Sequence, residues 1–326
     1  MVIRIGVLAF EGCTALTAIG PADVLRKASA IHADLYGKPA FEVLLVGVAS
    51  RSVVTDSGLP LACHTTIDSL QDPDLVIVPA IEGDPWLRAQ AEQGCIDWLL
   101  QRYRGQSELA SFCTGSFVLA STGLLDGRRA TTHWAFEQEF QHRFPAIDLQ
   151  PEAIIVDEGR LITAGGATSF LNLALYVAEK HCGPQTAQIT AGVLLIDRNK
   201  APQSAYAIFS GQKAHGDAVI LRAQVFIEEH AEQVQSIESL AAALAMSTRN
   251  FARRFKHATG NSPFEYVQRV RVEKAKRLLE REPDAAVGSV AMQVGYDDIG
   301  SFRRIFERFT GLVPSEYKRR HAGLRA

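Results

Sequence analysis

The residue whose chemistry stands out first is Cys113, in the stretch ELASFCTGSFVLAS. An apolar run, 108–112, ends at this cysteine, and Thr114 and Gly115 follow before a helix-like segment. A thiol on a sharp turn between a strand and a helix is a common way to present a nucleophile. The N–H groups of Thr114 and Gly115 would also open the helix, where an anion such as a carboxylate is favoured.

The turn formed by Cys113, Thr114 and Gly115 is called the elbow. An alternation of strands and helices would position it. Four runs rich in Val, Ile, Leu or Phe are typical of parallel strands buried on both faces: 2–9, 41–47, 74–79 and 108–112. Helices are expected at 20–30, 85–103, 114–122, 168–181 and 185–196, and a hairpin at 153–156 with 160–163. The pattern predicts a three-layer α/β domain with a mainly parallel sheet over 1–197. Ligands of such sheets bind at the carboxyl ends of the strands, where Cys113 lies.

The last third of the chain, 218–326, is predicted to be all-α. A stretch that mixes Pro, Gly, Ser and charged residues precedes it at 198–217 and is expected to be a linker. Two segments, 236–260 and 285–311, share one construction of a short apolar helix, a turn and a second helix. A long helix at 263–281 would hold the two segments at a fixed separation.

The second helix of each segment is expected to be amphipathic, with Ser247 or Asp298 as its N-cap. One face is apolar in both helices, and it consists of Phe251 and Phe255 in the first and Phe302, Phe306 and Phe309 in the second. The other face is polar, and it consists of Arg249, Asn250 and Arg253 in the first and Arg303, Arg304 and Arg308 in the second. This is the anatomy of a helix-turn-helix, whose basic face can enter a major groove.

On the stretch GYDDIGSFRRIFERFTGLVPSEYKRR, the last third resembles the AraC/XylS family of transcriptional regulators. The resemblance implies two recognition helices in successive major grooves of double-stranded DNA, at repeated promoter half-sites. The DNA-binding residues that it implies are Arg249, Asn250, Arg253, Lys256, Ile299, Gly300, Arg303, Arg304 and Arg308. Arg reads guanine bidentately, whereas Ile299 and Gly300 offer only apolar contact, for example with thymine methyl groups. Lys256, Arg271 and Arg308 are expected to meet phosphates or solvent.

The first 200 residues resemble the glutamine amidotransferase-like superfamily in its PfpI-type branch. The stretches that carry the resemblance are GPADVL, LVIVPA, FCTGSFVLASTGLLDGRRATTHW and LITAGGATSFLNLALYVAEKHCG. It implies a flavodoxin-like fold of the class I glutamine amidotransferase type. Joined to an AraC-type region, the architecture is that of GlxA-like regulators, in which the α/β part senses a ligand and dimerises.

Several positions favour a sensor over an enzyme. Peptidase-like relatives carry His directly after the cysteine, where this chain has Thr114. Isocyanide hydratases carry an acidic residue at the position of Thr17, and Glu11 has the wrong spacing to replace it. We therefore expect no catalysis, no cofactor and no metal. Two alternatives stay open: a Cys-dependent hydratase or amidase, and a thiol redox sensor, since a helix N-terminus lowers a thiol pKa.

The candidate pocket residues surround the elbow. They are Cys113, Thr114, Gly115, Glu11, Thr17, Glu82, His133 and Trp134. Trp134, with Trp86 as a second candidate, can face a cation, and Glu11 and Glu82 can pair with an amine. Similar regulators respond to amino acids and quaternary amines, so a small zwitterion is the expected effector. His133 lies in a family-typical TTHW stretch where it is more often structural.

Charge and cysteine usage agree with this division. Residues 218–326 carry 18 Lys and Arg against 13 Asp and Glu, whereas the rest of the chain carries 16 against 23. A basic module joined to an acidic body indicates a polyanion partner for the module. Five cysteines without CxxC or zinc spacing are typical of reduced thiols in the cytoplasm, and no signal peptide or membrane span is expected. The other expected partners are RNA polymerase and a second copy of the chain, as a homodimeric activator.

Overall fold

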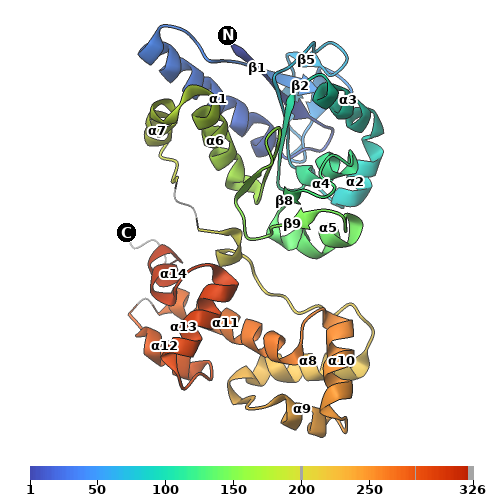
Figure 1. Ribbon diagram of the computed structural model, residues 1–326, viewed down its shortest axis with the longest axis vertical. Helices are drawn as coiled ribbons and strands as arrows, with labels where there is room; N and C mark the ends of the chain where they lie inside the picture. Colours follow the sequence, from blue (N-terminus) through green and yellow to red (C-terminus); the bar gives the residue numbers. More distant parts are fainter. Residues whose placement is uncertain (199–200, 283, 322–326) are drawn as a thin grey trace. The chain divides into compact units, whose positions relative to one another are not determined.

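A computed structural model describes residues 1–198, 201–282 and 284–321. The chain divides into two compact units, Met1–Gln203 and Ser204–Ala326 (Figure 1). Each unit is described by itself below.

The first unit is built on a seven-stranded sheet in the order β10-β11-β7-β6-β1-β2-β5. All neighbours pair in parallel except the hairpin of β10 and β11. Its strands are β1 (Ile3–Ala9), β2 (Phe41–Gly47), β5 (Thr65–Thr66), β6 (Leu75–Val78), β7 (Glu108–Phe112), β10 (Ile155–Asp157) and β11 (Leu161–Ala164). β6, β11 and the last four residues of β7 are buried throughout, as a sheet covered on both faces requires. Two small sheets pair β3 (Ser52–Val54) with β4 (Pro60–Ala62), and β8 (Arg129–Ala130) with β9 (Asp148–Leu149).

Helices cover both faces of this sheet, which confirms the expected three-layer α/β fold (Figure 1). One layer contains α1 (Ala15–Tyr36), α6 (Phe170–Cys182) and α7 (Pro184–Val193), which pack on one another. The other contains α2 (Pro85–Ala91), α3 (Gln93–Arg104) and α4 (Gly115–Ser121). A short helix α5 (Glu137–Arg143) follows the 3-10 turn η1 (Trp134–Phe136).

Two helix predictions in this unit were wrong in extent. The helix expected at 20–30 is α1, which begins five residues earlier and contains Pro21 in its interior. Pro favours a first turn, but burial of Ala18, Ala22 and Leu25 against the core outweighs the hydrogen bond that Pro21 cannot make. The helix expected at 85–103 is two helices, because the backbone leaves helical geometry at Glu92.

All the regular secondary structure of the second unit is helical in its described residues, as expected. It contains α8 (Ala218–His230), α9 (Ile237–Ala243), α10 (Thr248–Thr259), α11 (Pro263–Arg281), α12 (Val287–Gln293), α13 (Ile299–Thr310) and α14 (Pro314–His321). The predicted central helix agrees with α11 at both ends. Pro263 stands in its first turn and Ser262 caps it, accepting a hydrogen bond from the N–H of Glu265.

Two aromatic clusters hold the helices of this unit in place on α11. Phe251 and Phe255 of α10 are fully buried, and Phe255 meets Tyr266 of α11 edge to face at 5.2 Å. Phe302 and Phe306 of α13 are also fully buried, and Phe306 meets Tyr317 of α14 at 5.4 Å. Each second helix therefore buries its apolar face and leaves its other face outward.

Residues in the predicted linker, 198–217, pack on one unit or the other. Gln203 is buried in the first unit. Phe209 contacts the Tyr266 ring at 5.1 Å, and the His215 ring lies 2.9 Å from the side-chain oxygen of Gln224. Composition predicted a linker at 198–217, and these three of its side chains have partners in the folded units.

Candidate effector pocket and nucleic-acid interface

Cys113 lies on a tight turn between β7 and α4, as the sequence predicted. Its φ is +54°, in the left-handed region that a non-glycine residue seldom adopts. Gly115 allows the turn to approach β6, since a Cβ there would lie 2.3 Å from the carbonyl oxygen of Pro79. The peptide N–H of Cys113 donates to the carbonyls of Ala164 and Gly165, at 3.0 and 2.7 Å. The turn is therefore fixed by backbone contacts to two neighbouring strands.

The thiol of Cys113 has no activating partner among the described residues. Burial raises its pKa to about 11, although hydrogen bonds from Thr114 act in the opposite direction. The charge of Glu82 also raises this pKa. None of the described hydrogen bonds joins the thiol to an imidazole or a carboxylate. At neutral pH the group is a thiol, not the thiolate that a nucleophile requires.

Thr114 and Thr17, the two substitutions noted in the sequence, fasten loops to one another. The Thr114 hydroxyl accepts from the N–H of Ile81 at 2.9 Å and donates to its carbonyl at 2.7 Å. The Thr17 hydroxyl donates to the carbonyl of Thr14 and accepts from the N–H of Ala80. Glu82 accepts from the Thr14 hydroxyl at 2.8 Å. These residues are brought together around the loop after β6.

Glu11, His133 and Trp134 have contacts of their own. The Glu11 carboxylate accepts from the N–H of Val54, on the β3–β4 hairpin, rather than facing the thiol. His133 caps η1 by accepting from the N–H of Ala135 at 3.1 Å, and burial lowers its pKa. Its ring lies 5.3 Å from that of Trp134. The structural role suggested for His133 agrees with this cap.

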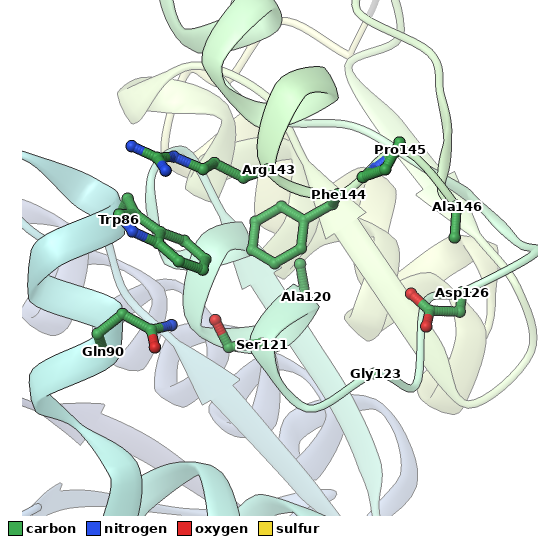
Figure 2. Close-up of a pocket in the computed structure, with 10 residues that line it drawn as sticks. All are labelled: Trp86, Gln90, Ala120, Ser121, Gly123, Asp126, Arg143, Phe144, Pro145 and Ala146. Atoms are coloured by element: carbon green, nitrogen blue, oxygen red, sulfur yellow. The ribbon is translucent and has the colours of Figure 1, made fainter.

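A cavity of about 310 Å³ lies at the other end of α4 (Figure 2). Trp86 and Phe144 line it as an aromatic pair with ring centres 5.8 Å apart. The guanidinium of Arg143 lies over the Trp86 ring at 4.8 Å, so this indole already faces a cation of the chain itself. The expectation that Trp86 faces a ligand cation beside Cys113 is wrong, because Trp86 lines a cavity to which Cys113 does not contribute.

The first recognition helix, α10, presents a polar face next to its N-cap. Ser247 caps it through the N–H of Asn250, as predicted. Arg249, Asn250, Arg253 and Lys256 are all exposed, and Arg253 donates to the side chain of Asn250 at 3.2 Å. By contrast, Arg254 forms an ion pair with Asp217, the N-cap of α8, and this pairing lowers the pKa of Asp217. Arg254 thus binds α8, whereas the polar side chains of Arg249, Asn250, Arg253 and Lys256 remain exposed to solvent.

The second recognition helix, α13, has the same design. Asp298 caps it by accepting from the N–H groups of Gly300 and Ser301, and these bonds lower its pKa. Arg303 and Arg304 are exposed, and Arg304 donates to the Ser301 hydroxyl at 2.8 Å. Ile299 is 42% exposed and lies close to Gly288 of α12.

Two expectations in the second unit need correction. Arg271 is half-buried and donates to the carbonyls of Ala231 and Val234, both at 2.9 Å, so its guanidinium joins α11 to the chain after α8 instead of being held for a phosphate. Phe309 is only partly buried, and Arg269 and Arg308 lie over its ring at 4.8 and 5.3 Å. Phe309 therefore lies at the end of the apolar face of α13, and its ring packs against two guanidinium groups.

Sequence reasoning missed Gln203, which makes hydrogen bonds to the TTHW stretch through Thr131, Thr132 and Trp134. No local signal marked it, since it stands in a stretch of linker-like composition. In the part of the chain that the structure describes, no cluster of His, Cys, Asp or Glu suits a metal ion. Within the same residues, no helix combines the length and apolarity needed to cross a bilayer.

Two family models match the chain. The DJ-1/PfpI family matches residues 3–180, and a helix-turn-helix domain matches residues 240–320. Among solved structures, Drosophila melanogaster DJ-1beta superimposes with a TM-score of 0.52 at 22% identity, covering 60% of this chain and all of its own. A ThiJ/PfpI family protein from Pseudomonas syringae also gives 0.52 at 22% identity, covering 61% of this chain and 77% of its own. These structures share the fold of the first unit.

Curated relatives align over most of the chain or over its first unit. The HTH-type transcriptional regulator CdhR of Pseudomonas aeruginosa is 28% identical, over 95% of this chain and 89% of its own. The HTH-type transcriptional regulator GlxA of Rhizobium meliloti is 24% identical, over 97% and 96%. The isonitrile hydratase of Pseudomonas putida is 32% identical, over 58% of this chain and 76% of its own.

Proposed function

Because the chain belongs to the DJ-1/PfpI family and carries an AraC-type helix-turn-helix region, we propose that it is a sequence-specific transcriptional regulator. Its relatives CdhR and GlxA, which align with nearly the whole chain, are HTH-type regulators. The first unit senses a small metabolite, and the second unit binds promoter DNA. An effector that binds the DNA-competent state more tightly than the other state shifts the population toward it.

One observation carries this proposal: two capped, amphipathic helices on one long helix each keep a polar face exposed. Burial of Phe251 and Phe255 in α10, and of Phe302 and Phe306 in α13, fixes which face points outward. That face presents Arg249 and Arg253 in α10, and Arg303 and Arg304 in α13. Arginines near the start of a helix can reach base edges in a major groove, and two such helices read successive grooves.

The finer features of the proposal follow from the resemblance to regulators of this architecture and from the residues around the elbow. The regulator works in the cytoplasm as a homodimer, activates promoters together with RNA polymerase, and binds repeated half-sites. Its effector is a small zwitterion, an amino acid or a quaternary amine, that reaches the elbow at Cys113. The residues proposed to line that pocket are Thr114, Gly115, Glu11, Thr17, Glu82, His133 and Trp134.

The geometry of the elbow supports sensing rather than catalysis. The thiol is 7% exposed, burial raises its pKa to about 11, and the hydratase position for an acid holds Thr17. The Thr17 hydroxyl donates to the carbonyl of Thr14 and accepts from the N–H of Ala80. A hydratase or amidase would need a base at this place.

Substitution in α10 tests the DNA-binding proposal. The full chain selects its own DNA from a random duplex pool, and fluorescence anisotropy then measures affinity for the selected sequence. Arg253→Ala should weaken specific binding by about 1–3 kcal/mol, because a base contact is lost. Arg277→Ala is the matched control, since this exposed arginine of α11 lines a cavity away from the polar faces of α10 and α13. An Arg253→Ala affinity equal to that of Arg277→Ala would remove Arg253 from the base-reading set.

A further inference from the structure

Gln203 is the last residue of the first unit, and its side chain is enclosed there. It begins the short 3-10 turn η3 (Gln203–Ala205) and is 2% exposed. Its backbone N–H donates to the carbonyl of Glu152 at 2.9 Å. A long polar side chain at a domain boundary is ordinarily solvated, so its burial needs a specific set of partners.

The cradle around this side chain matches a primary amide. The amide oxygen accepts from the N–H groups of Gly166, at 2.9 Å, and Trp134, at 3.3 Å. The amide nitrogen faces only acceptors, at 2.9–3.2 Å: the carbonyls of Thr132, Pro151 and Ala153 and the hydroxyl of Thr131. A carboxylate in the same place would put negative charge against these four oxygens.

Gly165, next to Gly166, leaves room for the Gln203 side chain. A Cβ at Gly165 would lie 2.1 Å from the amide carbon of Gln203, so a side chain at position 165 would displace the Gln203 amide. The backbone at Gly165 therefore lies directly against the Gln203 amide.

The same two loops hold the peptide groups of Cys113. The carbonyl of Cys113 accepts from the hydroxyls of Thr132, at 3.1 Å, and Ser116, at 2.8 Å. The N–H of Cys113 donates to the carbonyl of Gly165 at 2.7 Å. Gln203 binds both of the loops that contact Cys113. Its amide nitrogen donates to the carbonyl of Thr132, and its amide oxygen accepts from the N–H of Gly166, the residue after Gly165. The elbow and Gln203 therefore share one peptide group, Gly165–Gly166, and one residue, Thr132, which binds Cys113 through its hydroxyl and Gln203 through its carbonyl.

We propose that Gln203 is a positioning residue that couples the elbow at Cys113 to the chain leading into the second unit. While its amide is seated, the loops around Cys113 are closed and the chain at 201–205 is tied to the first unit. When a ligand displaces these loops, Gln203 leaves and that chain is released. The inference rests on the proposed sensor function and identifies the residue through which sensing is transmitted.

The first arm of the test measures how Gln203 controls access to the elbow. Purified full-length protein is treated with N-ethylmaleimide, and labelling of each cysteine is followed by peptide mass spectrometry. Gln203→Ala and Gln203→Glu should label Cys113 at least tenfold faster than wild type. The control is Gln150→Ala, since Gln150 directly precedes Pro151, whose carbonyl Gln203 uses, and its side chain bonds Asp148 and not Gln203 among the described residues. Cys95, 1% exposed in the core, reports global unfolding and should stay unlabelled.

The second arm works from the elbow toward Gln203 and leaves Gln203 intact. Thr132→Val removes the hydroxyl bond to the Cys113 carbonyl but keeps the Thr132 carbonyl that Gln203 uses. Hydrogen exchange in the peptide containing residues 201–205 should then be faster than in wild type. Ser121→Ala is the control, because this α4 hydroxyl bonds the carbonyl of Phe117 and not that of Cys113. A merely structural Gln203 would not transmit this change.

Either of two results overturns the inference. One is Cys113 labelling in Gln203→Ala at the Gln150→Ala rate. The other is exchange at 201–205 in Thr132→Val at the Ser121→Ala rate. Neither arm contains DNA, so a failure of the DNA-binding proposal leaves both readouts interpretable, and a failure here leaves the recognition helices untouched.

Discussion

At the scale of single residues, the elbow has the backbone geometry of a turn that presents a nucleophile, but its thiol has a raised pKa. Cys113 holds φ at +54°, and Gly115 fits where a Cβ would strike Pro79. Burial raises the pKa of the thiol more than the hydrogen bonds of Thr114 lower it, and the hydroxyls of Thr114 and Thr17 tie loops together. The redox-sensor alternative meets the same obstacle, because oxidation by peroxide requires a thiolate.

The titration of Cys113 provides a direct prediction. A thiol pKa raised to about 11 leaves the group protonated at pH 7, and its thiolate fraction grows as the pH rises toward that value. The rate of Cys113 labelling by iodoacetamide should therefore increase about tenfold per pH unit between pH 7 and 9. Peptide mass spectrometry after timed quenching measures it. A rate that levels off below pH 8 would show an activated thiolate and revive the enzyme and redox alternatives.

At the scale of elements, N-caps determine where the recognition helices begin. The Ser247 hydroxyl satisfies the N–H of Asn250 at the start of α10. Ser247→Ala should lower the free energy of unfolding by about 1 kcal/mol, and Ser247→Asp should retain the cap. Urea unfolding of the full chain, followed by circular dichroism, measures both. Equal losses for the Ala and Asp variants would contradict the capping role.

Local signals in the sequence predicted most of these elements. The apolar runs that became β1, β2, β6 and β7 are buried on both faces, and a capped, proline-initiated pattern predicted α11 at both ends. What could not be predicted depends on partners far along the chain. The continuation of α1 through Pro21 follows from burial in the core, and the clamp of Arg271 on Ala231 and Val234 follows from helix packing.

The candidate site was predicted unevenly for the same reason. Exposed faces of α10 and α13 follow from the spacing of Phe and Arg within one helix. The pocket residues come from several loops, so their orientation depends on tertiary contacts. Glu11 turns to the β3–β4 hairpin, and Gln203 joins the elbow from a stretch that composition marks as a linker.

At the scale of the whole molecule, charge separates the two functions. An excess of basic residues in 218–326 is joined to an excess of acidic residues in the rest of the chain. The logarithm of the DNA-binding constant should therefore fall linearly with the logarithm of the salt concentration, because phosphate contacts release counterions. Lys256→Ala should reduce that slope by about 1 if Lys256 meets a phosphate. Anisotropy titrations from low to high KCl test this, with Arg277→Ala as the control, and an unchanged slope for Lys256→Ala would exclude the phosphate contact.

Sensing is also a property of the whole molecule. A metabolite that binds only the folded state raises the melting temperature by mass action. We expect one amino acid or quaternary amine to stabilise both wild type and Cys113→Ala and to be recovered unchanged. Thermal-shift screening of the full chain, followed by mass spectrometry of the compound, measures this. Consumption of the compound, or stabilisation that needs Cys113, would contradict a purely sensory elbow.

The central claim is that α10 and α13 read two successive major grooves, and footprinting tests it most directly. The full chain is bound to duplex DNA selected from a random pool, and the DNA is probed by hydroxyl radicals and by methylation of guanine N7. The account predicts two protected windows on one face of the duplex, separated by one helical turn of about 10 base pairs. Arg303→Ala with Arg304→Ala should remove one window and leave the other. No selected sequence, or a single window that survives these substitutions and Arg253→Ala, would contradict the account.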